Sequence, residues 1–334
     1  MAPLFSIILP TYNRAHMLRA AVKSVLAQSC RDFECFVLDD GSTDETPRVF
    51  AEFQGESLLH LQRFPDNRRQ HVRRNWALGR AQGRFVAFLD SDDIWLPDRL
   101  EVFGRVLAAR PAVDFLFSNA WLWRDNRIIG TLFDADQPLA EGAVPGWYAV
   151  GHAQLPYLTS NLAIRRSLFD RVGRFREDME ILEDTELYAR MLKDGACVGA
   201  IRRPLAVRRL HAGQITHDHE VDYREALMAL EAGGAPQDVF LKEKERLALA
   251  SAGYLWRALR PREARQFLLR ELGDKASSLP LYWLTFLPFG TLAWAKELRR
   301  RCLMARHHPA WACPEIRGVY RLIDPLLAQE KTAA

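Results

Sequence analysis

The chain has 334 residues, enough for one large domain or for one domain with an extension. Its net charge of only +4 and its charged fraction of 26% are ordinary for a globular protein and imply no nucleic-acid partner. The five cysteines form no Cys-x-x-Cys pair. This argues against a disulfide framework or a zinc site and predicts a reducing, cytoplasmic location.

Short apolar runs alternate with helical patterns in the first third of the chain. The expected strands cover residues 4–9, 33–38, 58–61 and 84–89. The expected helices lie around the apolar stripe of residues 18–26, over residues 46–53 and over residues 98–109. This alternation predicts βαβ units in a mainly parallel sheet, because such sheets bury both strand faces and need continuously apolar strands.

The rest of the chain changes from mixed to helical. Residues 113–117 and 159–164 are further expected strands, and helices are expected over residues 166–172 and 187–192. From about residue 219 the pattern is helical throughout, with two amphipathic helices joined at Arg260–Pro261.

Three polar loops follow the first, second and fourth expected strands. They comprise residues 10–14, 39–42 and 90–93. Ligands of parallel sheets bind outside the carboxyl ends of the strands. One such loop would be ordinary turn chemistry, but three on one rim, two of them with paired carboxylates, indicate a nucleotide-plus-metal site.

The third loop is an acidic run. It follows an apolar expected strand and has three carboxylates, those of Asp90, Asp92 and Asp93, among its four residues. Like charges at this spacing repel, and a divalent ion such as Mg²⁺ or Mn²⁺ is the natural counter-charge. The alternative is a solvated turn in which Asp92 or Asp93 caps the helix that starts near Leu96.

Four stretches, in this order and at these spacings, resemble the family 2 glycosyltransferases, which are inverting, metal-dependent enzymes with a GT-A fold. The stretches are residues 6–14, 33–44, 83–100 and Glu183–Asp184 before a helix. The resemblance spans about residues 4–215 and is specific to the family, though to no single sugar. It implies an α/β fold of the GT-A type, a Rossmann-like, mainly parallel mixed sheet flanked by helices, with a C-terminal helical extension.

The resemblance also implies a domain plan and an activity. It places a catalytic domain over residues 1–218, with a nucleotide-binding part over about 1–110 and an acceptor part over 111–218, and a helical extension over 219–334. The implied reaction moves a sugar from a nucleotide-diphosphate donor, expected to be a UDP-sugar, to a hydroxyl of a glycan or lipid-linked acceptor in cell-surface polysaccharide biosynthesis.

Two other functions stay open. A nucleotidyltransferase also uses paired carboxylates, but it usually has a glycine- and lysine-rich phosphate loop, and residues 10–14 contain no glycine. A non-catalytic relative would bind a sugar nucleotide or a glycan without turnover. The presence of Asp90, Asp92 and Asp184 argues against such a relative, because a site that had lost its activity would be expected to have lost at least one of these carboxylates.

The resemblance implies donor-binding roles for the first two loops. Pro10 and Thr11 line the nucleobase pocket, and Asn13 supports the loop. Asp40, with Asp39 as the second candidate, accepts hydrogen bonds from the base, since a carboxylate facing N3–H suits uracil or thymine.

The acidic run matches the DxD motif of the family. Asp90, Ser91 and Asp92 correspond to the motif, which holds the ribose and a Mn²⁺ or Mg²⁺ ion that bridges the two phosphates. Asp93 is the alternative direct ligand. His211 is expected to be a further metal ligand or a diphosphate contact, although a lone histidine is more often structural.

The pair Glu183–Asp184 resembles the catalytic base of the family, with Asp184 as the base. An acceptor hydroxyl has a pKa far above 7, so it needs a carboxylate within hydrogen-bond reach as it attacks. The alternative is that both acids only stabilise the first turn of a helix through its macrodipole.

The tail combines an apolar, aromatic-rich stretch, residues 279–289, with a basic cluster up to residue 306. This combination suits the surface of an anionic membrane and predicts a peripheral contact through residues 279–306, on the cytoplasmic face. The alternative is a helical subdomain whose apolar face packs on the catalytic domain.

Overall fold

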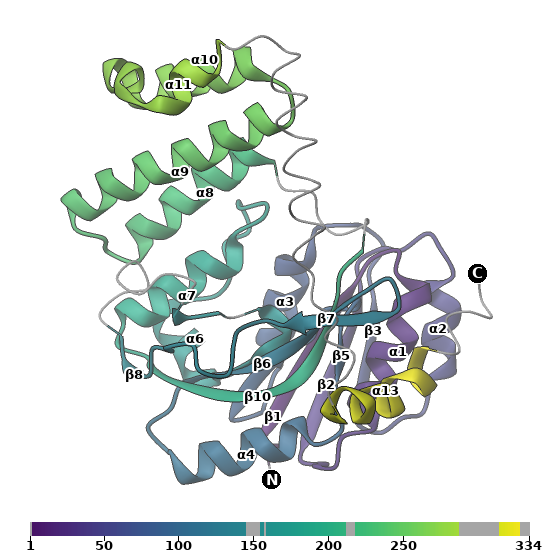
Figure 1. The fold of residues 1–334 in the computed structure, drawn as a ribbon. Helices are drawn as coiled ribbons and strands as arrows, with labels where there is room; N and C mark the ends of the chain where they lie inside the picture. The colour runs from purple at the N-terminus through teal and green to yellow at the C-terminus, as the bar shows by residue number, and fades with distance from the viewer. Residues whose placement is uncertain (1, 145–153, 157, 212–217, 287–313, 328–334) are drawn as a thin grey trace. The chain divides into compact units, whose positions relative to one another are not determined.

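The computed structural model describes residues 2–144, 154–156, 158–211, 218–286 and 314–327 (Figure 1). The chain divides into two compact units. The first comprises residues 1–178, 187–214 and 310–334, and the second comprises residues 179–186 and 215–309. The domain boundary at residue 218 stays a prediction.

Within the described residues, the first unit contains a ten-stranded mixed sheet in the order β3-β2-β1-β4-β9-β6-β10-β5, with β7 beside β6 and β8 beside β10. The strands are β1 Phe5–Thr11, β2 Phe33–Asp39, β3 Leu59–Arg63, β4 Phe85–Phe88, β5 Ile94–Trp95, β6 Phe115–Arg124, β7 Arg127–Thr131, β8 Gly142–Ala143, β9 Leu162–Arg165 and β10 Cys197–Arg209. The strands β1 to β4 pair in parallel, whereas β9 runs antiparallel to β4 and β6. The predicted α/β fold with a mixed, helix-flanked sheet is confirmed.

Helices bury both faces of this sheet. They are α1 Ala15–Leu26, α2 Thr46–Glu52, α3 Gln70–Leu78, α4 Arg99–Ala109, α6 Arg166–Val172, α7 Glu183–Lys193 and α13 Pro314–Leu327. Alternate residues of β1 enter different cores: Ile7 packs in the cluster that contains Leu18 of α1, and Ile8 in the cluster that contains Leu187 of α7. This two-sided burial explains why the first strands are continuously apolar.

Two expected elements start elsewhere, and four strands, β5, β7, β8 and β10, were not predicted. The strand expected over residues 159–164 begins as a 3-10 turn, Thr159–Asn161, before β9, and the helix expected from residue 187 begins at Glu183. Strand β10 was not predicted, because Pro204 interrupts its apolar pattern and prolines rarely stand inside strands. The register with β6 shifts on both sides of Pro204, so an irregularity in the pairing accommodates the proline.

The C-terminal helix α13 belongs to the first unit. Its Val319 and Ile323 are buried in a cluster with Trp121 and Trp123 of β6. The hydroxyl of Tyr320 accepts a hydrogen bond from the backbone N–H of Ile128 at 3.0 Å.

The second unit is helical. It contains α8 His219–Ala232, α9 Gln237–Arg257, α10 Pro261–Leu272, the 3-10 helix η2 Gly273–Ser278 and α11 Pro280–Leu284. The predicted helical hairpin is confirmed, since α9 and α10 meet at Arg260 and pack Leu255 against Phe267 and Leu268. Among the described residues, no helix is long and apolar enough to cross a membrane. Residues 287–306 of the tail, where its basic cluster stands, lie outside the described part.

Candidate active site

The loop after β2 is built around two buried carboxylates. Asp39 is fully buried, and its two oxygens accept hydrogen bonds from the N–H of Ser42 at 2.9 Å and from Nε of Arg63 at 3.0 Å. Gly41 has φ +77°, and a Cβ there would lie 2.7 Å from the backbone carbon of Asp66. Only glycine therefore fits this close approach of two loops.

Asp40 forms a buried ion pair with Arg73 of α3. Its Oδ1 accepts hydrogen bonds from the N–H of Arg68 at 3.0 Å and from Nε of Arg73. The side chains of Asp40 and Arg73 are only 3% and 5% exposed. Arg73 also donates to the carboxylate of Asp66 at 2.8 Å and lies 3.9 Å from the ring centre of Phe64.

The first loop is tied to the second through Asn13. Its N–H donates to Oγ of Ser42 at 2.8 Å, and its Oδ1 accepts from the N–H of Thr43 at 2.8 Å. Asn13 has φ +49°, a left-handed conformation that asparagine tolerates better than most residues. Pro10 and Thr11 precede it at the end of β1, and both are buried. The structure thus brings together Pro10, Thr11, Asn13, Asp39 and Asp40, while their roles toward a base stay predictions.

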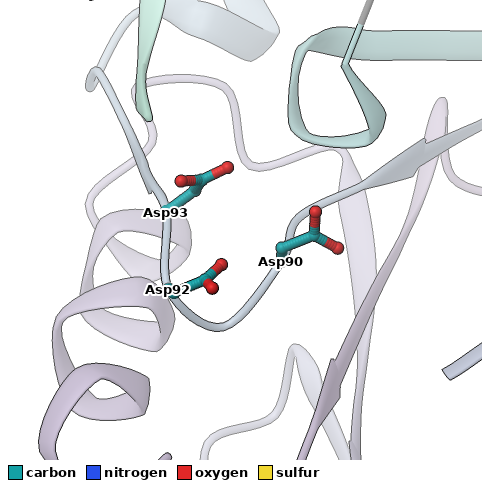
Figure 2. A group of neighbouring side chains, drawn as sticks. All are labelled: Asp90, Asp92 and Asp93. Carbon is teal, nitrogen blue, oxygen red and sulfur yellow. The ribbon is translucent and has the colours of Figure 1, made fainter. Parts of the chain in front are cut away.

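The acidic run follows β4 on a single turn. Figure 2 shows Asp92 and Asp93 on one limb of the turn and Asp90 on the other. One oxygen from each of the three carboxylates lies within 4.8 Å of the other two. Oδ1 of Asp90 accepts a hydrogen bond from Arg74 at 2.7 Å. The backbone N–H of Asp90 donates to the hydroxyl of Ser160 at 3.0 Å.

Asp92 and His211 are in contact. Nε2 of His211 lies 3.0 Å from Oδ2 of Asp92, and both side chains are mostly buried. The neighbouring Arg209 is buried as well and donates through its guanidinium to the carbonyls of Asp92, Ser91 and Met17. The strand end that carries His211 is therefore fastened to the acidic turn, and it places His211 beside one of the two candidate metal ligands.

Asp93 is the most buried member of the run. Its Oδ1 accepts from the N–H of Arg209 at 3.0 Å, and its N–H donates to the carbonyl of Asp90 at 2.9 Å. Burial and the neighbouring charges of Asp92 and Asp90 raise the pKa of Asp93 to about 8. A cation among the three carboxylates would relieve this repulsion.

The structure corrects the helix-cap alternative for this run. The helix after it, α4, begins at Arg99, and its N-cap position is Asp98. Neither Asp92 nor Asp93 caps it, because the short strand β5, Ile94–Trp95, lies between the acidic turn and the helix.

The donor set of the acidic turn fits a divalent ion. Hard cations such as Mg²⁺ and Mn²⁺ take oxygen ligands, and three carboxylates offer oxygens at one point of the turn. Asp92 and Asp93 would supply the ligands, with His211 next to Asp92.

Glu183 and Asp184 stand in the first turn of α7, in the part of that helix that belongs to the second unit. Glu183 is 1% exposed, whereas Asp184 is half-buried. Oδ1 of Asp184 accepts hydrogen bonds from the N–H of Thr185 at 2.6 Å and from its hydroxyl at 3.2 Å. Acidic side chains in the first turn of a helix interact favourably with its macrodipole. This interaction does not exclude a further role for Asp184.

Several residues around the carboxylates have no sequence motif of their own. Arg74 and Arg209 hold the acidic turn, and Glu225 of α8 accepts hydrogen bonds from the loop before α7. Asn75 lies beside Arg74 on α3, but its side chain is hydrogen-bonded to both backbone groups of Phe175 at 2.8 and 3.0 Å. Its observed contacts are therefore structural.

Three polar loops at the carboxyl edge of parallel strands, one with clustered carboxylates, are typical of α/β proteins that bind a nucleotide together with a divalent ion. Residues 6–121 match the protein family "Glycosyl transferase family 2". A glycosyltransferase of PGL/p-HBAD biosynthesis from Mycobacterium bovis is 30% identical over 201 residues, which cover 59% of this chain and 73% of that protein. The chain belongs to glycosyl transferase family 2.

Other relatives match over shorter stretches. The Escherichia coli protein WfgD, a UDP-Glc:alpha-D-GlcNAc-diphosphoundecaprenol beta-1,3-glucosyltransferase, is 38% identical over 127 residues, 38% of this chain. The chain spans about half the length of such relatives, 49% in the case of WfgD and 40% in that of TuaG from Bacillus subtilis.

Solved structures confirm the GT-A fold. TarS of S. aureus, residues 1–349 in complex with UDP, superposes with a TM-score of 0.59 at 19% identity, covering 90% of this chain and 92% of that one. The mannosyltransferase PcManGT from Pyrobaculum calidifontis, in complex with GDP-Man and Mn²⁺, has a TM-score of 0.54 at 22% identity and covers 98% of this chain and 86% of that one.

Proposed function

We propose that this protein transfers a sugar from a UDP-sugar to a hydroxyl of a glycan or lipid-linked acceptor, by a metal-dependent single displacement that inverts the anomeric carbon. The observation that carries the proposal is the cluster of Asp90, Asp92 and Asp93, with oxygens within 4.8 Å of one another. A family 2 sequence with an intact acidic cluster favours catalysis over a binding role. The catalytic domain would cover residues 1–218.

The loops after β1 and β2 would hold the nucleoside. Both oxygens of Asp39 already have protein donors, whereas both hydrogen bonds of Asp40 fall on Oδ1. Asp40 is therefore the better candidate to accept the N3–H of uracil, through Oδ2. Pro10 and Thr11 would line the base pocket. The structures of TarS in complex with UDP and with UDP-GlcNAc support a UDP-sugar as donor.

The acidic turn would hold the ribose and the diphosphate. Asp90 and Ser91 would face the ribose, and Asp92, Asp93 and His211 would hold Mn²⁺ or Mg²⁺. When bound, such an ion neutralises charge on the departing diphosphate. Arg74 keeps the carboxylate of Asp90 in place, and Arg209 fixes the backbone of the turn.

Asp184 would act as the general base. It would take the proton from the acceptor hydroxyl as that oxygen attacks the anomeric carbon, since the free hydroxyl is too weak an acid to ionise near neutral pH. The backbone and hydroxyl of Thr185 hold one oxygen of Asp184, and this orients the carboxylate. Glu183, buried beside it, would support the same turn.

The acceptor and the location are further parts of the proposal. The similarity to WfgD, a glucosyltransferase that acts on GlcNAc-diphosphoundecaprenol, supports a lipid-linked acceptor and a place in cell-surface polysaccharide biosynthesis. In the second unit, Trp283 and Phe286 are 61% and 53% exposed, and Arg265 lies 4.1 Å from the ring centre of Phe286. Exposed aromatic rings beside a basic group suit a peripheral contact with the cytoplasmic face of an anionic membrane.

Thermal-shift screening tests the donor. UDP-, GDP- and dTDP-sugars are each titrated with and without Mn²⁺, because a ligand that binds the native state raises its apparent stability. We expect the UDP forms to give the largest shift, and only with the ion. A larger shift with GDP forms would overturn the uridine assignment. Release of pyrophosphate from UTP and a sugar 1-phosphate, with no release of UDP from the UDP-sugars, would indicate a nucleotidyltransferase.

The variant Asp184→Asn tests the base. It keeps the size of the side chain and removes its proton affinity, so UDP affinity should stay unchanged while sugar transfer falls by about 10²–10⁴-fold. Transfer at the wild-type rate would exclude Asp184 as the base.

A further inference from the structure

The loop that leads into α7 is held by one buried carboxylate of the second unit. Glu225 stands on α8, and its side chain is 1% exposed. Its Oε1 accepts a hydrogen bond from the N–H of Glu180 at 2.6 Å, and its Oε2 accepts from the N–H groups of Ile181 and Leu182, each at 2.9 Å. Three consecutive backbone donors thus converge on one side chain.

These hydrogen bonds are favourable both for the Glu225 carboxylate and for the backbone N–H groups of residues 180–182. Hydrogen bonds to an ionised carboxylate are stronger than those between neutral groups. The backbone N–H groups before a helix need acceptors from outside the helix, and a buried carboxylate needs donors for both oxygens. Arg224, 3.6 Å from Oε1 of Glu225 and 3.4 Å from the carboxylate of Glu180, adds positive charge at the outer side.

The anchored segment sets the start of α7. The N–H of Glu186 donates to the carbonyl of Leu182 at 3.0 Å, so the first turn of the helix is built on the residue that Glu225 holds. Glu183 and Asp184 are the first two residues of that turn. A shift of residues 180–182 would therefore move the Asp184 carboxylate.

We propose that Glu225 is a positioning residue for the reaction: by fixing the backbone of residues 180–182 it orients Asp184. The proposal rests on the proposed function, in which Asp184 is the base. It gives the helical unit a part in the chemistry, because the loop before the base is fastened by a side chain of α8 rather than by the sheet that carries the donor loops. Glu225 itself needs no contact with the substrate.

The test compares Glu225→Gln with Glu231→Gln, which makes the same chemical change at an exposed position of the same helix. Glutamine keeps the size of the side chain but turns one acceptor oxygen into an NH₂ group that faces a backbone N–H. Three quantities are measured: amide hydrogen exchange of residues 180–184, the affinity for UDP with Mn²⁺, and kcat for release of UDP from the most stabilising UDP-sugar, with water as the acceptor of the sugar.

We expect Glu225→Gln to exchange these amides faster, to bind UDP as the wild type does, and to lose about 10- to 100-fold in kcat, as a misplaced catalytic group does. Glu231→Gln should match the wild type in all three. Glu225→Asp, which keeps the charge on a shorter side chain, should recover part of kcat. Unchanged exchange of the α4 amides in each variant shows that the sheet unit is folded.

Two results would overturn the inference. Unchanged exchange of residues 180–184 in Glu225→Gln would show that the carboxylate does not hold the loop. Faster exchange with wild-type kcat would show that the loop does not position the base. Failure of the proposed function looks different: the wild type itself would release no UDP from any donor, whatever the exchange of the variants.

Discussion

The buried pair of Asp40 and Arg73 predicts a large loss of stability when its negative charge is removed. In Asp40→Asn the volume is kept, but Arg73, 5% exposed, remains charged without its buried partner. Removing one member of a buried ion pair costs about 3–5 kcal/mol. Arg73 keeps its contacts with Asp66 and with the ring of Phe64, so we expect the lower part of that range, about 3 kcal/mol.

Asp66 offers a matched control, because it pairs with the same arginine from a side chain that is 55% exposed. Exposed ion pairs contribute about 0–1 kcal/mol, so Asp66→Asn should have a small effect. For a domain of about 150–250 residues, 1 kcal/mol corresponds to about 2–4 °C in Tm. We therefore expect Asp40→Asn to lower Tm by about 6–12 °C and Asp66→Asn by less than about 4 °C.

Differential scanning calorimetry of the two variants and the wild type, in one buffer without nucleotide, measures both shifts. Equal shifts would refute the reasoning, because burial would then have no influence on the pair. A shift below about 2 °C for Asp40→Asn would refute it as well, since it would mean that a buried guanidinium tolerates the loss of its counter-charge.

Three further predictions concern the metal, a thiol and the tail. Asp92→Ala should abolish Mn²⁺-dependent UDP binding in calorimetry, whereas Asp170→Ala, at an exposed position of α6, should leave it intact; undiminished binding in Asp92→Ala would contradict the metal assignment. Burial raises the pKa of the Cys35 thiol above its ordinary value of 9.0, so the unfolded chain releases this proton first as the pH rises. The free energy of unfolding should then fall by about 1.4 kcal/mol per pH unit above pH ~9, and urea titrations of Cys35→Ala should show a flatter slope there. The wild type should sediment partly with anionic liposomes at low salt and less so after Trp283→Ala with Phe286→Ala; equal recovery in the supernatant with and without liposomes would end the membrane proposal.

Local sequence patterns were enough to predict the sheet edge. The runs that became β1, β2 and β4 are apolar on both faces, and the polar loops follow directly, so the order of the elements fixes which side chains share the edge. The same reasoning located Asn13 next to the second loop, where Thr43 donates to it.

Pairing between distant segments could not be predicted in this way. Arg73 and Arg74 are adjacent on α3, yet Arg73 binds Asp40 and Arg74 binds Asp90. The two side chains point in different directions because the segment is helical, and the sequence alone does not assign each arginine to its partner. The sequence does not show that Arg209 donates to the backbone of the acidic turn, or that Glu225 accepts from the loop before α7. In both cases the two partners lie far apart in the sequence. The alternative that Asp92 or Asp93 caps α4 was wrong for a local reason, since a two-residue strand separates the acidic turn from that helix.

Counter-charge is spread unevenly along this edge of the sheet. Asp39, Asp40 and Asp90 each bind a guanidinium, which stays charged at any working pH. Asp92 instead meets the imidazole of His211, and Asp93 accepts from a backbone N–H. Of these five carboxylates, Asp92 and Asp93 therefore have the weakest permanent compensation, although Asp93 is among the most buried. An added cation gains most where negative charge is least compensated, so we expect the proposed divalent ion beside Asp92 and Asp93, since Asp90 is already paired with Arg74.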